Sequence, residues 1–212
     1  MRRFRVMLEE LLATRFNGLG SSLNGLSRVI DVLDLEVSRG AIAGYHALLQ
    51  FIVAMDLYSR GFDVSVEEPV DGGFKADVYA EGPQGSVIVE IETGYVPPDK
   101  VRVLEEFLEA KVAFKAVAYS PYADLFIVAA PSHVRLLVAP ELLKPVEDRD
   151  ILDVMVIRDL ASRYDRARAS RILWRAPLSR VDGIASINVS NLKVEYRITG
   201  KGGSKNVLPE IP

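Results

Sequence analysis

Residues 74–92 have the sequence FKADVYAEGPQGSVIVEIE, and this stretch decides how the middle of the chain folds. Residues 86–92 are rich in β-branched side chains, which favours a strand. Residues 76–80 have the length of a second, shorter strand. The Gly-Pro-Gln-Gly sequence at 82–85 between them is typical of a turn. We therefore predict that the two strands form an antiparallel β-hairpin.

The segments on either side of this hairpin alternate between strand and helix patterns. Before it, residues 62–67 alternate apolar and polar side chains, as a half-buried strand does. After it, the expected elements are a helix at 100–119 capped by Asp99, a buried strand at 125–130, a helix at 131–143 and a strand at 151–157. A meander of strands followed by strand–helix–strand crossovers predicts an α/β fold, in which helices flank a central mixed β-sheet.

The first 60 residues show helical periodicity. The expected helices are at 1–16, 26–37 and 41–60, and the residues at 17–24, rich in Gly, Ser and Asn, are expected to form a loop. Residues 1–40 then form an N-terminal helical extension to a core of residues 41–157. The apolar helices at 26–60 also suit an interface between two copies of the chain, so a homodimer is one expected state.

The last part of the chain, residues 158–212, is rich in arginine. Seven arginines lie between Arg158 and Arg180 against two aspartates, although the whole chain has a net charge of −3. We predict a helix at 159–175, ended by Pro177, and a small hairpin from 187–189 and 193–198. Three arginines would share one face of this helix and contact nucleic-acid phosphates: Arg168, Arg171 and Arg175. An exposed helix of a thermophilic protein would have the same pattern, and the scarcity of Asn, Gln and Cys also suits a thermophile.

The composition excludes several classes of site. The chain has no cysteine, which excludes disulfides, thiolate zinc sites and cysteine nucleophiles. It has two histidines, which excludes a metal centre built from several histidines. No apolar run is long enough to span a membrane, and the N-terminus does not resemble a secretory signal. We therefore expect a soluble cytoplasmic protein.

Three carboxylates lie on the predicted hairpin. Glu90 and Glu92 are two residues apart on one strand, so their side chains face the same side. Asp77 lies on the partner strand, across from or diagonal to this pair. Lys75 is the one cation on these two strands, so the carboxylates would repel one another unless a further cation lay between them. Mg²⁺ or Mn²⁺, which prefer oxygen ligands, would suit this position and would equip it for phosphodiester hydrolysis.

The order of these elements and motifs resembles the PD-(D/E)XK nuclease superfamily, which is also called restriction-endonuclease-like. The similar stretches are YSRGFDVSVE at 58–67, FKADVY at 74–79 and VIVEIETG at 87–94. The resemblance covers residues 41–157 and points to an archaeal type of the superfamily. It implies that Asp77 and Glu90 bind the metal ion.

At the third motif position, Glu92 replaces the lysine that is usual in the superfamily. In some members this lysine comes from the following helix, which makes Lys100, Lys111 and Lys115 candidates for the role, with Lys115 the foremost. Tyr119 shares a helix face with Lys115, which is similar to a Gln-x-x-x-Tyr pattern in the RecB-like branch. His46 matches the place of a histidine in some members of that branch. The resemblance thus implies four catalytic residues, Asp77, Glu90, Glu92 and Lys115, and two accessory residues, His46 and Tyr119.

Each of these residues also has a structural interpretation. The carboxylates could form the solvated face of a half-exposed hairpin. His46 could be a hydrogen-bonded core histidine, Lys115 an exposed helix residue and Tyr119 a core residue. The sequence therefore supports two hypotheses: a metal-dependent deoxyribonuclease that hydrolyses DNA phosphodiester bonds, or an inactive protein of the nuclease fold that binds nucleic acid or a protein partner.

Overall fold

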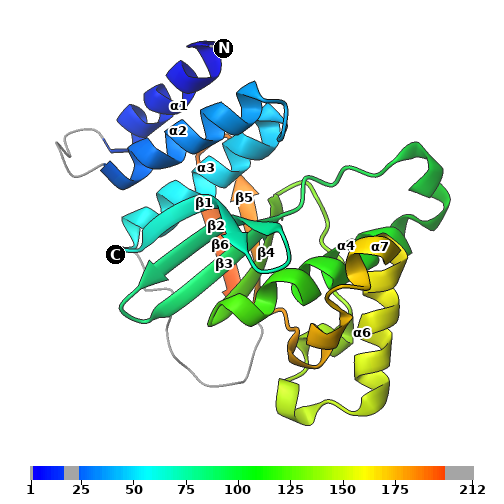
Figure 1. The fold of residues 1–212 in the computed structure, drawn as a ribbon. Helices are drawn as coiled ribbons and strands as arrows, with labels where there is room; N and C mark the ends of the chain where they lie inside the picture. The colour runs from blue at the N-terminus through cyan, green and yellow to red at the C-terminus, as the bar shows by residue number, and fades with distance from the viewer. Residues whose placement is uncertain (1, 17–23, 199–212) are drawn as a thin grey trace.

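A six-stranded β-sheet forms the centre of the computed structural model, which describes residues 2–16 and 24–198 (Figure 1). The strands follow chain order across the sheet: β1 (Asp63–Val70), β2 (Phe74–Gly82), β3 (Gly85–Ile91), β4 (Leu125–Pro131), β5 (Gly183–Asn188) and β6 (Lys193–Ile198). The first three strands are antiparallel, β3, β4 and β5 are parallel, and β6 runs antiparallel to β5. The predicted α/β fold with a central mixed sheet is confirmed.

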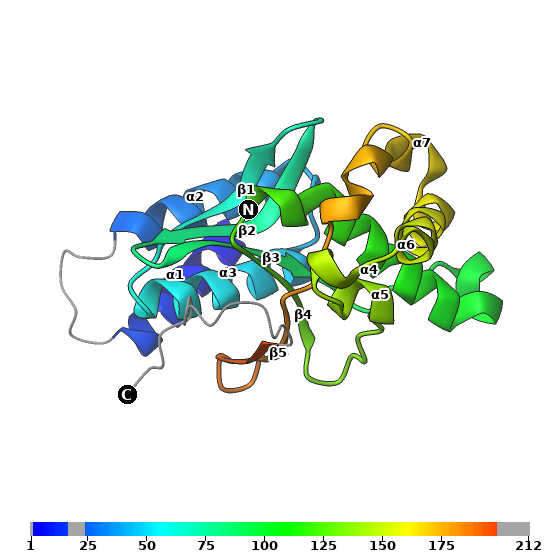
Figure 2. The ribbon, with the colours of Figure 1, turned by 90° about the horizontal axis from the view of Figure 1, so that it is seen from below.

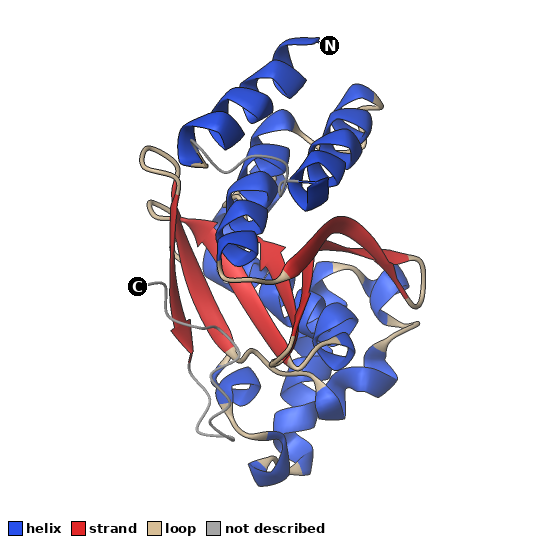
Figure 3. Ribbon diagram, turned by 90° about the vertical axis from the view of Figure 1, so that its left-hand side faces the viewer, coloured by secondary structure: helices blue, strands red, loops and turns tan. Residues whose placement is uncertain are grey.

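Helices cover both faces of the sheet, as the views in Figure 2 and Figure 3 show. The first layer contains α1 (Arg2–Arg15), α2 (Asn24–Ser38) and α3 (Gly44–Ser59), so the predicted N-terminal helical region is present. The second layer contains α4 (Leu104–Tyr119), α5 (Pro140–Leu143), α6 (Ile151–Tyr164) and α7 (Arg166–Ala169). Four 3-10 helices complete the description: η1 (Pro98–Val103), η2 (Ser120–Tyr122), η3 (Val146–Asp148) and η4 (Leu173–Leu178).

Each layer of helices shares a hydrophobic core with one face of the sheet. Val89 of β3 and Ile127 of β4 face the first layer, whereas Ile88 and Phe126 face the second. Apolar side chains of α2 expected at a dimer interface are instead buried in the first core: Leu26, Val29, Ile30 and Leu33. A homodimer therefore remains a prediction, but these buried side chains are not available to form its interface.

The segment 151–157, predicted to be a strand, is the first half of α6. Asp150 and Asp153 form a capping box, in which each side chain accepts a hydrogen bond from the other residue's backbone N–H. Ile157, Leu160 and Ala161 then lie on the buried side of the helix. The run of apolar residues at 151–157 has the composition of a strand, so the helical spacing was not recognised in the sequence. The fifth strand of the sheet is β5, which belongs to the predicted C-terminal hairpin.

Three other boundaries differ from the prediction. The helix expected at 131–143 is reduced to α5, which begins at Pro140, because residues 132–134 form a turn and 135–139 belong to no regular element. Asp99 does not cap α4, which begins at Leu104 after η1. The arginine-rich helix expected at 159–175 is divided into the end of α6, then α7 and η4, because Asp165 adopts an extended conformation and caps α7.

Some predictions concern residues outside the described ranges. Most of the loop expected at 17–24 falls there, and so do residues 199–212 of the C-terminal segment. Among the helices at 2–16 and 24–198, none has both the length and the apolar character needed to cross a bilayer.

Candidate active site

The site lies where β2 and β3 separate. Their backbone ladder runs from the Gly82–Gly85 pair to the Val78–Val89 pair and ends there. Beyond it, carboxylates take the place of backbone acceptors. Glu90 Oε1 accepts a hydrogen bond from the Asp77 N–H at 2.9 Å, and Asp77 Oδ2 accepts one from the Ile91 N–H at 2.7 Å. Each carboxylate is therefore fixed by the backbone of the opposite strand.

The direction of the side chains along β2 changes at Asp77. Phe74 and Val78 are four residues apart and would share a face in a regular strand. Instead, Phe74 belongs to the core beneath α4 and Val78 to the core beneath α3. On β1, Glu67 lies opposite Asp77 in the register and has a φ of 52°, which is uncommon for a residue other than glycine. The β1–β2 hairpin thus arches away from the other strands (Figure 3), which opens the gap that the carboxylates occupy.

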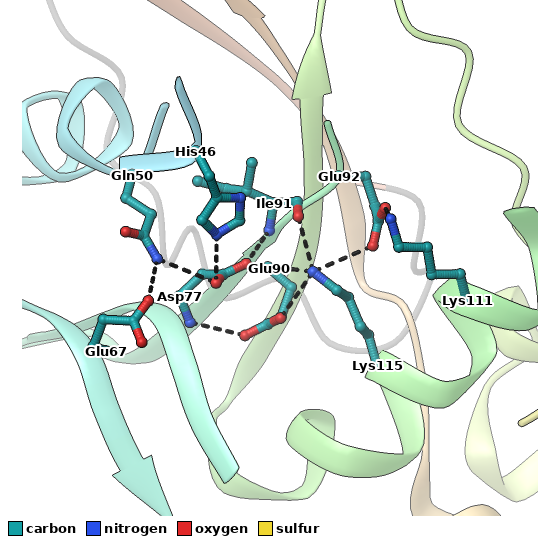
Figure 4. A network of polar contacts seen from close by, with 9 residues as sticks. All are labelled: His46, Gln50, Glu67, Asp77, Glu90, Ile91, Glu92, Lys111 and Lys115. Atoms are coloured by element: carbon teal, nitrogen blue, oxygen red, sulfur yellow. Dashed lines mark hydrogen bonds and ion pairs between the residues drawn. The ribbon is translucent and has the colours of Figure 1, made fainter. Parts of the chain in front are cut away.

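Helix α3 approaches this gap from the first layer. His46 and Gln50 lie one turn apart on it and both point at Asp77 (Figure 4). His46 Nε2 donates a hydrogen bond to Asp77 Oδ1 at 2.9 Å, because an ionised carboxylate can only accept. Gln50 Nε2 donates to the same Oδ1 at 3.1 Å and to Glu67 Oε1 at 2.7 Å. The amide of Gln50 therefore joins two carboxylates that would otherwise repel each other.

Helix α4 approaches from the second layer and brings Lys115 into the gap (Figure 4). The Lys115 Nζ atom lies 2.8 Å from the Ile91 carbonyl oxygen and 3.3 Å from Asp77 Oδ2. It is also 3.1 Å from Glu90 Oε2 and 3.2 Å from Glu92 Oε1. The ammonium group is thus surrounded by oxygen atoms of four residues: Asp77 on β2, Glu90 and Ile91 on β3, and Glu92 just after β3.

Glu92 lies at the outer edge of this cluster, just after β3. Its Oε2 atom forms an ion pair with Lys111 Nζ at 2.5 Å, and its Oε1 atom faces Lys115. Both oxygens are buried without a hydrogen bond from the residues that the structure describes. Glu92 therefore contacts two lysines of α4 that lie one turn apart.

Burial and neighbouring charges shift the pKa values of the central groups in opposite directions. Burial alone would raise the pKa of Asp77, but the Lys115 charge and the His46 hydrogen bond outweigh it and hold that pKa well below its usual value. Burial and the charge of Asp77 raise the pKa of Glu90 well above its usual value. Burial opposes the charge of Lys115, but Glu92, Asp77 and Glu90 raise the pKa of Lys115, which stays protonated.

The donor set fits a divalent cation. Four buried or half-buried carboxylates face two ammonium groups, so the cluster has two excess negative charges when all are ionised: Glu67, Asp77, Glu90 and Glu92 against Lys111 and Lys115. Carboxylate and carbonyl oxygens are the ligands that Mg²⁺ and Mn²⁺ prefer. Ligand atoms of His46, Glu67 and Asp77 also lie within 4.8 Å of one another. Gln50 Oε1 beside them is buried without a hydrogen-bond partner among the described residues.

The remaining predicted residues are Tyr119 and the three arginines expected to contact phosphates. Tyr119 is buried and stacks edge-on against Phe74, and burial together with Glu90 and Asp77 raises its pKa. Arg168, Arg171 and Arg175 do not share a helix face, because the predicted helix is interrupted. Arg175 is only 3% exposed and donates hydrogen bonds to Asp71 and to the Ala118 carbonyl, so it is not a phosphate contact.

Arg168 is placed better for a ligand. It is exposed, and its guanidinium carbon lies 4.8 Å from the centre of the Phe74 ring and 5.4 Å from that of Phe114. Phe114 immediately precedes Lys115. Among the described residues no acidic side chain forms an ion pair with Arg168. Its charge therefore remains available at the edge of the site.

Two residues of the cluster, Gln50 and Glu67, were not singled out from the sequence. Gln50 follows His46 by four residues, so helical spacing alone could have paired them. Glu67 continues an alternating strand pattern, which does not distinguish it from its neighbours. Only its position opposite Asp77 shows that it belongs to the site.

A cavity of about 850 Å³ lies at the opposite ends of β3 and β4, near Gly85, Asp124 and Leu125, and none of the predicted site residues lines it. Two of its charged side chains, Arg180 and Asp182, form an ion pair with each other. The carboxylate cluster and this cavity are therefore at different ends of the sheet.

Comparison of the chain with protein-family models, curated proteins and solved structures gave no match.

Proposed function

We propose that this protein is a metal-dependent deoxyribonuclease that resembles the PD-(D/E)XK superfamily. One observation carries the proposal: carboxylates of Asp77 and Glu90, the Ile91 carbonyl and the Lys115 ammonium converge at the point where β2 and β3 separate. The point is at the carboxyl end of β3, which is parallel to β4. Ligands of open α/β sheets commonly bind outside the carboxyl ends of parallel strands.

Asp77, Glu90 and the Ile91 carbonyl would hold the divalent ion, either Mg²⁺ or Mn²⁺. Such an ion would lower the pKa of a water molecule and polarise a phosphoryl oxygen, which are the two requirements for phosphodiester hydrolysis. Burial raises the pKa of Glu90, and a divalent ion beside it would favour the ionised form. The backbone hydrogen bonds of Asp77 and Glu90 keep both carboxylates in position without a ligand.

The other residues of the cluster would orient this centre and supply positive charge. His46 and Gln50 restrain Asp77 from the side of α3. Lys115 would offset negative charge on the phosphate, in the role that the resemblance implies for a lysine from the following helix. Arg168, exposed beside Phe114, would bind the phosphate backbone of the substrate strand.

A second candidate is an inactive protein of the same fold that binds nucleic acid or a protein partner. The observation in its favour is that Lys115 already occupies the position between Asp77, Glu90 and Ile91. A permanently bound ammonium would offset part of the charge of these carboxylates without any metal. The two candidates differ in whether a divalent ion enters this position.

A cleavage assay tests the proposal. Supercoiled, linear, branched and single-stranded DNA, with RNA alongside, are incubated with Mg²⁺ or Mn²⁺ and with wild type, Asp77→Asn or Glu90→Gln. Glu81→Gln is the matched control, because Glu81 is an exposed acid of the same strand β2. We expect metal-dependent cutting of DNA that Asp77→Asn and Glu90→Gln each reduce by about 100-fold or more and Glu81→Gln leaves unchanged. Cutting that survives Asp77→Asn, or no cutting of any substrate, would contradict the proposal.

A further inference from the structure

The Lys115 ammonium occupies the position that a divalent ion would need. Its Nζ atom is 2.8 Å from the Ile91 carbonyl, 3.1 Å from Glu90 Oε2 and 3.3 Å from Asp77 Oδ2. These are the oxygens that the proposed metal centre uses. Two cations within about 3 Å of each other repel strongly in a buried site, so these oxygens hold one cation at a time.

Glu92 offers Lys115 a second position. Its Oε1 atom is already 3.2 Å from Lys115 Nζ, on the side away from Asp77. Lys111 binds the other oxygen at 2.5 Å and so fixes the carboxylate. Neither oxygen of Glu92 receives a hydrogen bond within the described residues, so its contacts here are the two lysines. A small movement of the Lys115 side chain would leave it paired with Glu92 alone.

We propose that Lys115 and a divalent ion compete for the oxygens of Asp77, Glu90 and Ile91, and that Glu92 is the positioning residue that holds Lys115 when the ion is bound. This inference rests on the proposed metal centre and adds how the centre is regulated. It explains why an acid at the third motif position is compatible with the site. The acid retains the displaced lysine next to the metal instead of releasing it into solvent.

Direct measurement of Mn²⁺ binding to the full chain, by titration calorimetry without substrate, tests the competition. Lys115→Met removes the competing ammonium and keeps a side chain of similar length. Lys75→Met is the matched control, since it removes the same charge from β2, where exposed Lys75 forms an ion pair with Glu36. We expect Lys115→Met to bind Mn²⁺ about tenfold more tightly than wild type, a typical coupling between two sites. The change for Lys75→Met should be much smaller.

Lys115→Met could fail to fold, because it leaves buried carboxylates without a partner. Lys115→Gln is therefore measured as well, since its amide is neutral and can still donate to the Ile91 carbonyl. It should tighten Mn²⁺ binding in the same direction. Circular dichroism of each variant establishes that it is folded before its affinity is compared.

A double-mutant cycle tests the role of Glu92. Glu92→Gln should weaken Mn²⁺ binding in the wild-type background, because Lys115 then has no second position. In the Lys115→Met background the same substitution should have almost no effect. An equal loss in both backgrounds would mean that Glu92 binds the metal itself, and the positioning role would be wrong.

The failures of the two proposals are distinguishable. Mn²⁺ binding that Asp77→Asn abolishes but that Lys115→Met and Lys115→Gln do not tighten would overturn the competition and leave the metal centre intact. Equal tightening by Lys115→Met and Lys75→Met would show a general charge effect and would also overturn it. An absence of Mn²⁺ binding in wild type and in every variant would reject the metal centre, and both proposals with it.

Discussion

Asp77 connects the two halves of the site, because its two carboxylate oxygens face different partners. Oδ1 accepts hydrogen bonds from His46 and Gln50 on α3, and Oδ2 accepts one from the Ile91 backbone and faces Lys115 of α4. A single carboxylate thus receives contacts from both helical layers. Its position in the gap between β2 and β3 gives it this access, since a side chain in a regular sheet faces only one layer.

Glu67 provides a test through the pH dependence of stability. Burial raises the pKa of its carboxyl above the usual value. Because the pKa is raised in the folded state, this carboxyl contributes favourably to the free energy of unfolding below its unfolded pKa. That contribution is lost as the pH rises through the folded pKa. Glu67→Gln keeps the hydrogen bond from Gln50 but removes this charge. We therefore expect it to raise the melting temperature at pH 8 in a chelating buffer, and to raise it less at pH 4.

Melting curves of wild type and Glu67→Gln between pH 4 and pH 9 check this expectation. Glu68→Gln is the control, because Glu68 is the adjacent half-buried acid of β1. A melting-temperature difference for Glu67→Gln that stays constant or shrinks as the pH rises would contradict the assigned burial of this carboxyl.

Arg168 is predicted to bind the phosphate backbone, because it is exposed, lies over Phe74 and Phe114, and forms no ion pair with a described acid. Arg168→Ala should weaken DNA binding in EDTA and reduce the slope of log K against log salt by about 1, the value for one phosphate contact. Fluorescence anisotropy at several salt concentrations measures both. Arg166→Ala is the matched control on α7, and an equal effect of both substitutions would show a diffuse attraction instead.

The residues of the site differ in how far the sequence could predict them. Asp77, Glu90 and Glu92 lie on a hairpin with a clear turn, so their proximity follows from the chain itself. Lys115 and His46 required the resemblance, because nothing local shows that α3 and α4 meet the same strand end. Gln50 could have been paired with His46 by helical spacing, whereas Glu67 depends on the arch of the β1–β2 hairpin, which no sequence pattern indicated.

At the scale of elements, an apolar run predicted the wrong secondary structure at a place where helix capping determines it. The run at 151–157 has the composition of a strand, but the capping box of Asp150 and Asp153 begins α6 there. Conversely, Asp165 ends one helix and caps the next, which divides the arginine-rich segment. Strands were easier to predict than helix boundaries, because turns and alternation identify them directly.

The capping box also gives a prediction. Asp150→Ala removes the side chain that accepts a hydrogen bond from the Asp153 N–H at 2.9 Å. An N-cap of this kind contributes about 1 kcal/mol to the free energy of unfolding. We expect urea denaturation to show a loss of this size for Asp150→Ala and a much smaller change for Asp148→Ala, an exposed acid just before it. Equal effects would mean that the cap does not hold α6.

Across the whole molecule, one sheet connects all parts of the described chain. The N-terminal helices share a core with one face, and the C-terminal hairpin extends the sheet beyond β4. Arg175 of η4 also reaches back to Asp71 at the tip of the β1–β2 hairpin, with Nη2 and Oδ2 3.0 Å apart. The arched hairpin that opens the site is therefore held by a segment that lies more than 100 residues later in the chain.

We infer that the oxygens of Asp77, Glu90 and Ile91 form a divalent-cation site at the end of β3. The most direct test is a crystal structure of the full chain with Mn²⁺, in which anomalous scattering locates the ion. We expect an anomalous peak between these three oxygens, with the Lys115 ammonium displaced onto Glu92. Crystals at saturating Mn²⁺ that show no peak there, with Lys115 still between Asp77 and Glu90, would contradict it.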